Sequence, residues 1–127
     1  MDVYDPSVDP DPSEWLELSE GERIELVAEY HRAAGGSVPN PTLHAAIHTT
    51  VETQIAMGEE LPVHHTLMRL MTEGLERHDA IHAIGSVLAE TMYDMLRETE
   101  KVGEEPNAAY FSALDRLSAK GWRRSAR

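Results

Sequence analysis

The sequence of 127 residues contains no cysteine, which excludes disulfide bonds and thiolate zinc sites. A chain without disulfides fits the reducing cytosol, so we expect a cytoplasmic protein. Aromatic residues make up only 6% of the chain, so the core must consist mostly of aliphatic side chains and methionine. No hydrophobic run is long enough to span a membrane, and no apolar signal peptide opens the chain, so we expect no membrane partner.

Basic residues are also scarce: 11 lysines and arginines face 23 aspartates and glutamates, for a formal net charge of −12. Nucleic acids require clustered basic side chains, so we expect no nucleic-acid partner. The one basic cluster, at residues 120–127, is interpreted as a solvated tail.

The length predicts one domain, which we place at residues 15–119. Residues 1–14 contain three prolines and five acidic residues, a composition that favours an extended arm over a helix. The basic tail at 120–127 completes the predicted organisation.

Apolar residues recur at helical spacing in several segments, and no strand-like alternation is present, so the fold class is all-α. Ser19 and Glu22 form a capping box that begins the first clear helix, and Asn40 with Pro41 begins the second. Two further segments follow near residues 62–74 and 77–100, and Asn107 could cap a final helix. We therefore predict a small bundle of about four to five helices.

Two pairs of histidines four residues apart stand out among the seven histidines of the chain: His44 with His48, and His78 with His82. At about 100° per residue, each pair falls within or beside the apolar stripe of its predicted helix. Both pairs are therefore expected to border the core between helices.

Metal ligation is the chemistry that this pattern favours, because imidazoles four residues apart on a helix project side by side and can chelate one ion. Nitrogen ligands of this kind suit zinc, iron or nickel. Glu52, one turn after His48, could ligate the ion, orient His48 or act as general base on a bound water. Asp79 and Glu90 are candidates for hydrogen-bond partners of the ligands.

The other histidines have simpler explanations. His31 lies near the end of the first helix, where its charge would complement the helix dipole. His64 and His65 are interpreted as surface residues, although one of them could complete a metal shell. The methionines at helical spacing are interpreted as core residues.

A buried hydrogen-bonded network is the alternative explanation for the two pairs, since histidines are common at the margins of helical cores. Neither pair is the His-Glu-x-x-His signature of zinc proteases, because Ala45 and Asp79 follow the first histidine of each pair.

The segments NPTLHAAIHTTVETQI and RHDAIHAIGSVLAETMY resemble the bacterial domain of unknown function 1841 family. The resemblance covers about residues 38–98 and falls on an Asn-Pro-x-x-His-x-x-x-His opening, a downstream glutamate, and a second His-x-x-x-His before Leu88, Glu90 and Tyr93. The chain departs from the pattern at Gly85-Ser86 and at Thr53. The resemblance implies a shared site but no known reaction.

Two functions of different classes remain open. The first is a helical metal-binding protein, with a metal-dependent hydrolase or oxidoreductase as its catalytic form. The second is a non-enzymatic, self-associating scaffold in which Gly85 and Ala89 allow a homodimer to form through the long helices. A pH-sensing switch is a third hypothesis, and it requires histidines that titrate between about pH 5 and 8.

Overall fold

The computed structural model describes residues 1–35, 38–97 and 106–125. Its elements are α1 (Pro12–Glu17), α2 (Glu20–Ala34), α3 (Pro41–Ala56), the 3₁₀ helix η1 (Gly58–Glu60), α4 (Val63–Thr72), α5 (Arg77–Arg97), α6 (Pro106–Arg116) and α7 (Ala119–Ser125). The described residues contain no strand, which confirms the all-α class.

The described residues contain seven α-helices, more than the four to five that the sequence predicted. The two additional short helices lie where the sequence indicated an arm and a tail. Asp11 accepts hydrogen bonds from the backbone N–H groups of Ser13 and Glu14 and so caps α1, whose first residue is Pro12. At the other end, α7 takes up most of the predicted basic tail. Glu100, the predicted end of the long helix, lies outside the described residues.

Two of the three predicted capping sites are confirmed, whereas α6 begins at Pro106 and therefore contains Asn107. Ser19 and Glu22 form the capping box of α2, and Asn40 accepts from the backbone N–H of Leu43 at 3.1 Å to begin α3. Gly35 ends α2 in the left-handed conformation with a φ of 76°, which a glycine adopts without steric cost.

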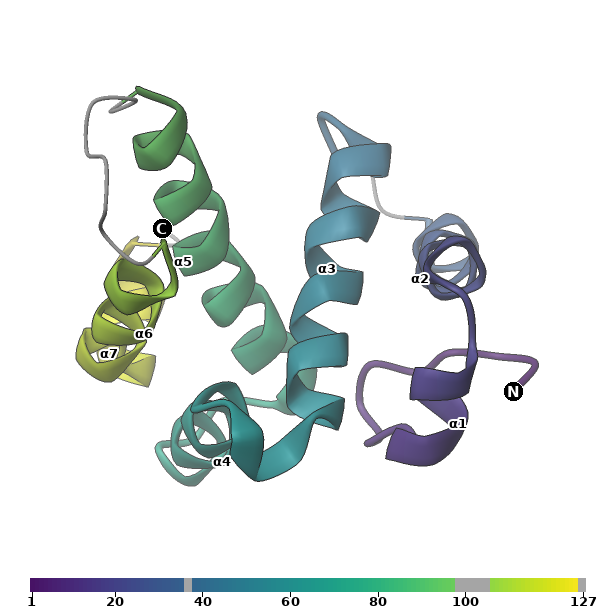
Figure 1. Cartoon of the computed structure of the whole chain (residues 1–127), viewed down its shortest axis with the longest axis horizontal. Coiled ribbons are helices and arrows are strands. Elements are labelled where there is room, and N and C mark those ends of the chain that lie inside the picture. The colour runs from purple at the N-terminus through teal and green to yellow at the C-terminus, as the bar shows by residue number, and fades with distance from the viewer. Residues whose placement is uncertain (36–37, 98–105, 126–127) are drawn as a thin grey trace.

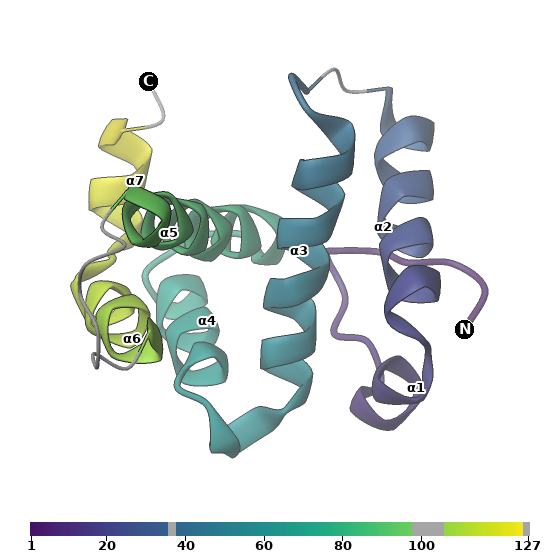
Figure 2. The same cartoon turned by 45° about the horizontal axis from the view of Figure 1, so that its top comes forward.

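Helix α3 lies at the centre of the molecule, with α1 and α2 on one side and α4 and α5 on the other (Figure 1). Figure 2 shows α5 crossing α3 steeply, with α6 and α7 on the far side of α5. None of the described helices combines the length and hydropathy that crossing a membrane requires.

Two hydrophobic clusters hold these layers together. The smaller one joins the arm and the first two helices to α3 through Tyr4, Trp15, Val27 and Ala45. The larger one fills the space among α3, α4, α5, α6 and α7 and includes Val51, Leu67, Leu70, Ile84 and Leu114. The histidine-bearing faces of α2, α3 and α5 lie between the two clusters.

The α3–α5 crossing is close because Gly85 has no side chain. A Cβ atom at Gly85 would lie 3.2 Å from Cγ2 of Ile47, tighter than ordinary van der Waals contact. The small residue therefore serves a close contact between two helices of this chain.

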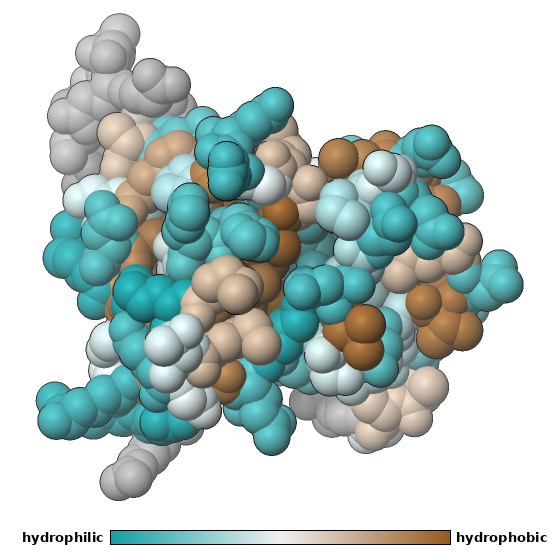
Figure 3. Space-filling model, turned by 90° about the horizontal axis from the view of Figure 1, so that it is seen from below, coloured by the Kyte–Doolittle hydropathy of each residue, from teal (hydrophilic) through white to brown (hydrophobic). Residues whose placement is uncertain are grey.

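The methionines do not fill the core as expected. Met57, Met68, Met71, Met92 and Met95 are all exposed, and aliphatic side chains with Trp15 and two tyrosines fill the interior. On the face shown in Figure 3, hydrophobic residues form small groups among hydrophilic ones.

Candidate metal centre

Five histidines from three helices meet beside the α3–α5 crossing. His31 comes from α2, His44 and His48 from α3, and His78 and His82 from α5. Ring centroids lie 5.2 Å apart for His44 and His82, and 5.4 Å apart for His48 and His78. The two predicted pairs therefore face each other across the crossing.

Four of the five histidines can direct one ring nitrogen each toward a common point. One ligand atom from each of His31, His48, His78 and His82 lies within 4.8 Å of the other three. The group contains three of the four predicted histidine ligands and adds His31, while His44 and the fifth predicted ligand, Glu52, are outside it.

His31 was missed as a ligand because its place near the end of α2 already had an adequate explanation. Its Nδ1 atom donates to the carbonyl oxygen of Val27 at 2.8 Å, which leaves Nε2 as the acceptor nitrogen of the neutral ring. His44 Nε2 lies 3.0 Å from this atom, so His44 is the donor in that contact. His44 therefore occupies the lone pair that His31 would offer to an ion.

Several ring nitrogens of the cluster have no hydrogen-bond partner. Among the described residues, the buried side-chain atoms without a partner are His48 Nδ1, His78 Nε2, His82 Nε2 and Thr49 Oγ1. Buried polar atoms in native proteins are nearly always satisfied, and leaving one unpaired costs about 1–3 kcal/mol. Three such nitrogens in one cluster indicate a site built for something other than mutual hydrogen bonding.

Burial also keeps the cluster in the form that binds metal. Desolvation, with repulsion from neighbouring imidazoles, lowers the pKa of His48 to about 2 and that of His82 to about 4. Burial likewise lowers the pKa of His44 and of His78. These rings are therefore neutral at pH 7, as a metal ligand must be.

Glu52 lies one turn from His48 but is not among the converging atoms. Its side chain is buried, and its carboxylate accepts hydrogen bonds from Nη1 and Nη2 of Arg77, each at 2.8 Å, while the Tyr4 hydroxyl donates to Oε2. Both oxygens are thus engaged in hydrogen bonds, and the carboxylate is paired with a buried arginine.

The other predicted site residues lie at the periphery. Asp79 is exposed, and its charge only partly offsets the lowered pKa of His78. Glu90 is exposed and makes no recorded hydrogen bond among the described residues. His64 and His65 lie on α4 outside the cluster, with His64 half-buried and His65 exposed.

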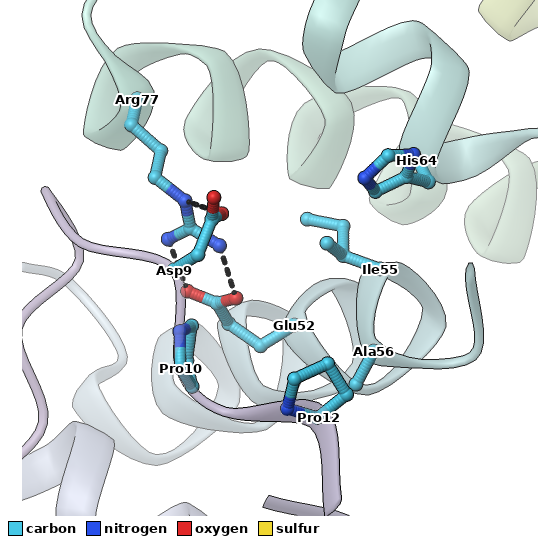
Figure 4. Close-up of a pocket in the computed structure, with 8 residues that line it drawn as sticks. All are labelled: Asp9, Pro10, Pro12, Glu52, Ile55, Ala56, His64 and Arg77. Atoms are coloured by element: carbon cyan, nitrogen blue, oxygen red, sulfur yellow. Dashed lines mark hydrogen bonds and ion pairs between the residues drawn. The ribbon is translucent and has the colours of Figure 1, made fainter.

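Arg77 fastens the N-terminal arm to the same region. Its Nε donates to Asp9 Oδ1 at 2.7 Å and its Nη1 to the Pro6 carbonyl oxygen at 2.9 Å. Figure 4 shows the guanidinium between Glu52 and Asp9, beside a cavity of about 260 Å³. The cavity is lined by Asp9, Pro10, Pro12, Glu52, Ile55, Ala56, His64 and Arg77, so none of the five clustered histidines reaches it.

Comparison with known proteins gives one match. The model of a family described as a domain of unknown function (DUF1841) matches residues 10–116. The match confirms the family indicated by the histidine segments and extends beyond them in both directions. No curated protein and no solved structure matches the chain.

Proposed function

The chain belongs to the DUF1841 family, and from this premise and the geometry of its histidines we propose that it binds one transition-metal ion through His31, His48, His78 and His82. The observation that carries the proposal is the convergence of four ring nitrogens from three helices within 4.8 Å. Three of these residues have a buried ring nitrogen that makes no hydrogen bond among the described residues. These atoms are His48 Nδ1, His78 Nε2 and His82 Nε2. A bound ion would satisfy all three atoms at once.

The spacing supports a tetrahedral ion after a small adjustment. Zn–N bonds of about 2.0–2.1 Å place tetrahedral nitrogens about 3.3–3.4 Å apart. Atoms within 4.8 Å of one another must therefore close by about 1 Å, which side-chain rotation on rigid helices can supply.

The ligand atoms of the proposed site limit which metal ions it can bind. Four neutral imidazole nitrogens suit zinc, copper, nickel or iron and disfavour magnesium and calcium, which prefer oxygen ligands. We limit the proposal to metal binding, because both carboxylate oxygens of Glu52, the base predicted from the sequence, accept hydrogen bonds from Arg77.

The first test is the metal content of untagged protein, measured by elemental mass spectrometry after incubation with zinc and gel filtration. We expect one zinc ion per chain in the wild type and loss of the ion in His82→Ala, which removes a ligand. His65→Ala, which changes an exposed histidine outside the cluster, should keep the full metal content. Metal-free wild-type protein, or equal binding by both variants, would contradict the proposal.

A second test identifies the ligand set by comparing His31→Ala with His44→Ala. We expect the first variant to weaken zinc binding at least as much as His82→Ala, because it removes a ligand. We expect the second to bind zinc as tightly as the wild type or more tightly, because it frees the His31 lone pair. Isothermal titration calorimetry measures both, and the reverse order would show that His44, not His31, is the ligand.

A self-associating scaffold is the second candidate, and one observation favours it. The last turns of α5 expose the large side chains of Met92, Tyr93, Met95 and Leu96, the last of which is 78% exposed. Exposed apolar groups of this kind mark interaction surfaces. In this case the histidines would be a structural network, and the zinc test would find no ion while light scattering would find a dimer.

A further inference from the structure

We propose that Tyr4 is a positioning residue of the metal site, which fixes His48 in the tautomer whose Nδ1 lone pair is available to the ion. The proposal rests on the proposed metal binding and adds to it the role of the N-terminal arm. Tyr4 precedes the residues that the family model matches, so family membership does not assign it this role.

The tautomer follows from counting protons along one chain of hydrogen bonds. The Tyr4 hydroxyl has a single proton, which it donates to Glu52 Oε2. It must therefore act as acceptor toward His48 Nε2, which lies 2.8 Å away, and Nε2 carries the imidazole proton. The neutral ring then has its lone pair on Nδ1, the buried atom that makes no hydrogen bond among the described residues.

The direction of the Tyr4 proton is itself fixed by charge. Arg77 donates one hydrogen bond of 2.8 Å to each oxygen of the Glu52 carboxylate, so both oxygens act as acceptors. The Tyr4 hydroxyl therefore donates its proton to the carboxylate and accepts the proton of the imidazole. The same relation, a ligand histidine that donates its other N–H to a partner, orients ligands in many metal sites.

The arm is held beside the histidines at three points. The Tyr4 ring is 1% exposed and packs edge-on against His48 at a centroid distance of 5.5 Å. Pro6 and Asp9 are bound by Arg77, the residue immediately before His78. Docking of the arm and orientation of His48 are therefore coupled, and by linkage an ion that requires the Nδ1 lone pair must stabilise the docked arm.

The test uses Tyr4→Phe, which removes the hydroxyl and keeps the buried ring. We expect its zinc affinity, measured by competition with a chromophoric chelator, to fall about 10–100-fold, as when other partners of ligand histidines are removed. Tyr30→Phe is the matched control, because the Tyr30 ring packs edge-on against Tyr4, His31 and His78 while its hydroxyl makes no hydrogen bond recorded among the described residues. Its affinity should equal that of the wild type.

A spectroscopic readout separates positioning from a general loss of structure. The ¹⁵N chemical shifts of His48 in metal-free wild-type protein should report the Nε2–H tautomer, whereas Tyr4→Phe should show a mixture of tautomers. If Tyr4→Phe does not fold, the wild-type spectrum still decides, since an Nδ1–H tautomer would overturn the inference.

The outcomes distinguish this inference from the proposal on which it rests. Wild-type zinc binding with an unchanged affinity in Tyr4→Phe overturns the role of Tyr4 and leaves the metal site standing. An equal loss in both tyrosine variants also overturns it, since packing alone would then explain the effect. A wild-type protein that binds no zinc overturns both.

Discussion

Glu52→Gln should lower the free energy of unfolding by about 3–5 kcal/mol, the usual cost of breaking a buried ion pair from one side. The Glu52 and Arg77 side chains are 0% and 3% exposed, so neither charge can turn to water when the other is removed. A glutamine offers one acceptor oxygen and places an amide N–H group against a guanidinium. The remaining carboxylate beside the buried Arg77 charge would then be Asp9, whose side chain is 74% exposed.

Urea unfolding followed by circular dichroism measures this difference. The control is Glu25→Gln, the same substitution at a surface pair with Arg32, which should change stability by about 1 kcal/mol or less. Glu52→Leu combined with Arg77→Met should recover part of the loss, because apolar side chains leave no unpaired charge. Equal effects of the two glutamine variants would refute the buried pair as a major stabilising feature.

Metal-free protein should lose stability steeply as the pH falls from 7 to 5. The folded state lowers the pKa of His48 from 6.5 to about 2, so this ring is neutral when folded and takes up a proton on unfolding. Below pH 6.5 the unfolded state binds more protons, and stability therefore decreases as the pH falls. His48 alone should contribute a loss of about 2 kcal/mol by pH 5, at about 1.4 kcal/mol per pH unit. His82, with a pKa lowered to about 4, adds a loss of the same sign.

Urea titrations at each pH in the presence of a chelator measure this slope. His65→Ala should keep it, because that residue is exposed and outside the cluster, while His48→Gln should reduce it. Between pH 7 and 5 a flat stability profile would mean that the rings bind protons equally in the folded and unfolded states. Protonation would then not be coupled to a structural change, which would also remove the pH-switch hypothesis.

The sequence predicted the parts of the site that depend on local rules. The helical period placed both histidine pairs on core-facing stripes, and the capping residues Ser19 and Asn40 located the starts of α2 and α3. Because α3 and α5 both turn these stripes inward, three of the four predicted histidine ligands lie in the converging group.

The remaining features depend on contacts between distant residues, which one sequence does not reveal. Glu52 looked like a ligand because it continues the spacing of His44 and His48, and its pairing with Arg77, 25 residues away, had no local signal. Tyr4 lies in an acidic, proline-containing arm whose composition indicated an extended segment and gave no sign of burial, yet its ring is almost completely buried. The exposed methionines were mispredicted for a similar reason, since helical spacing does not show which apolar face of a helix packs against another helix.

The contact between Gly85 and Ile47 limits how closely the two histidine-bearing helices approach each other. Ile47 is adjacent to His48, and Gly85 lies one turn after His82, so this close contact between the two helices falls beside the proposed ligands. The helix backbone fixes the spacing within each histidine pair, so the distance between the two helices sets how far one pair lies from the other. The methyl group of an alanine at residue 85 would push α3 and α5 apart and so separate the two histidine pairs. The radius of the ion that the proposed site prefers would change with that separation.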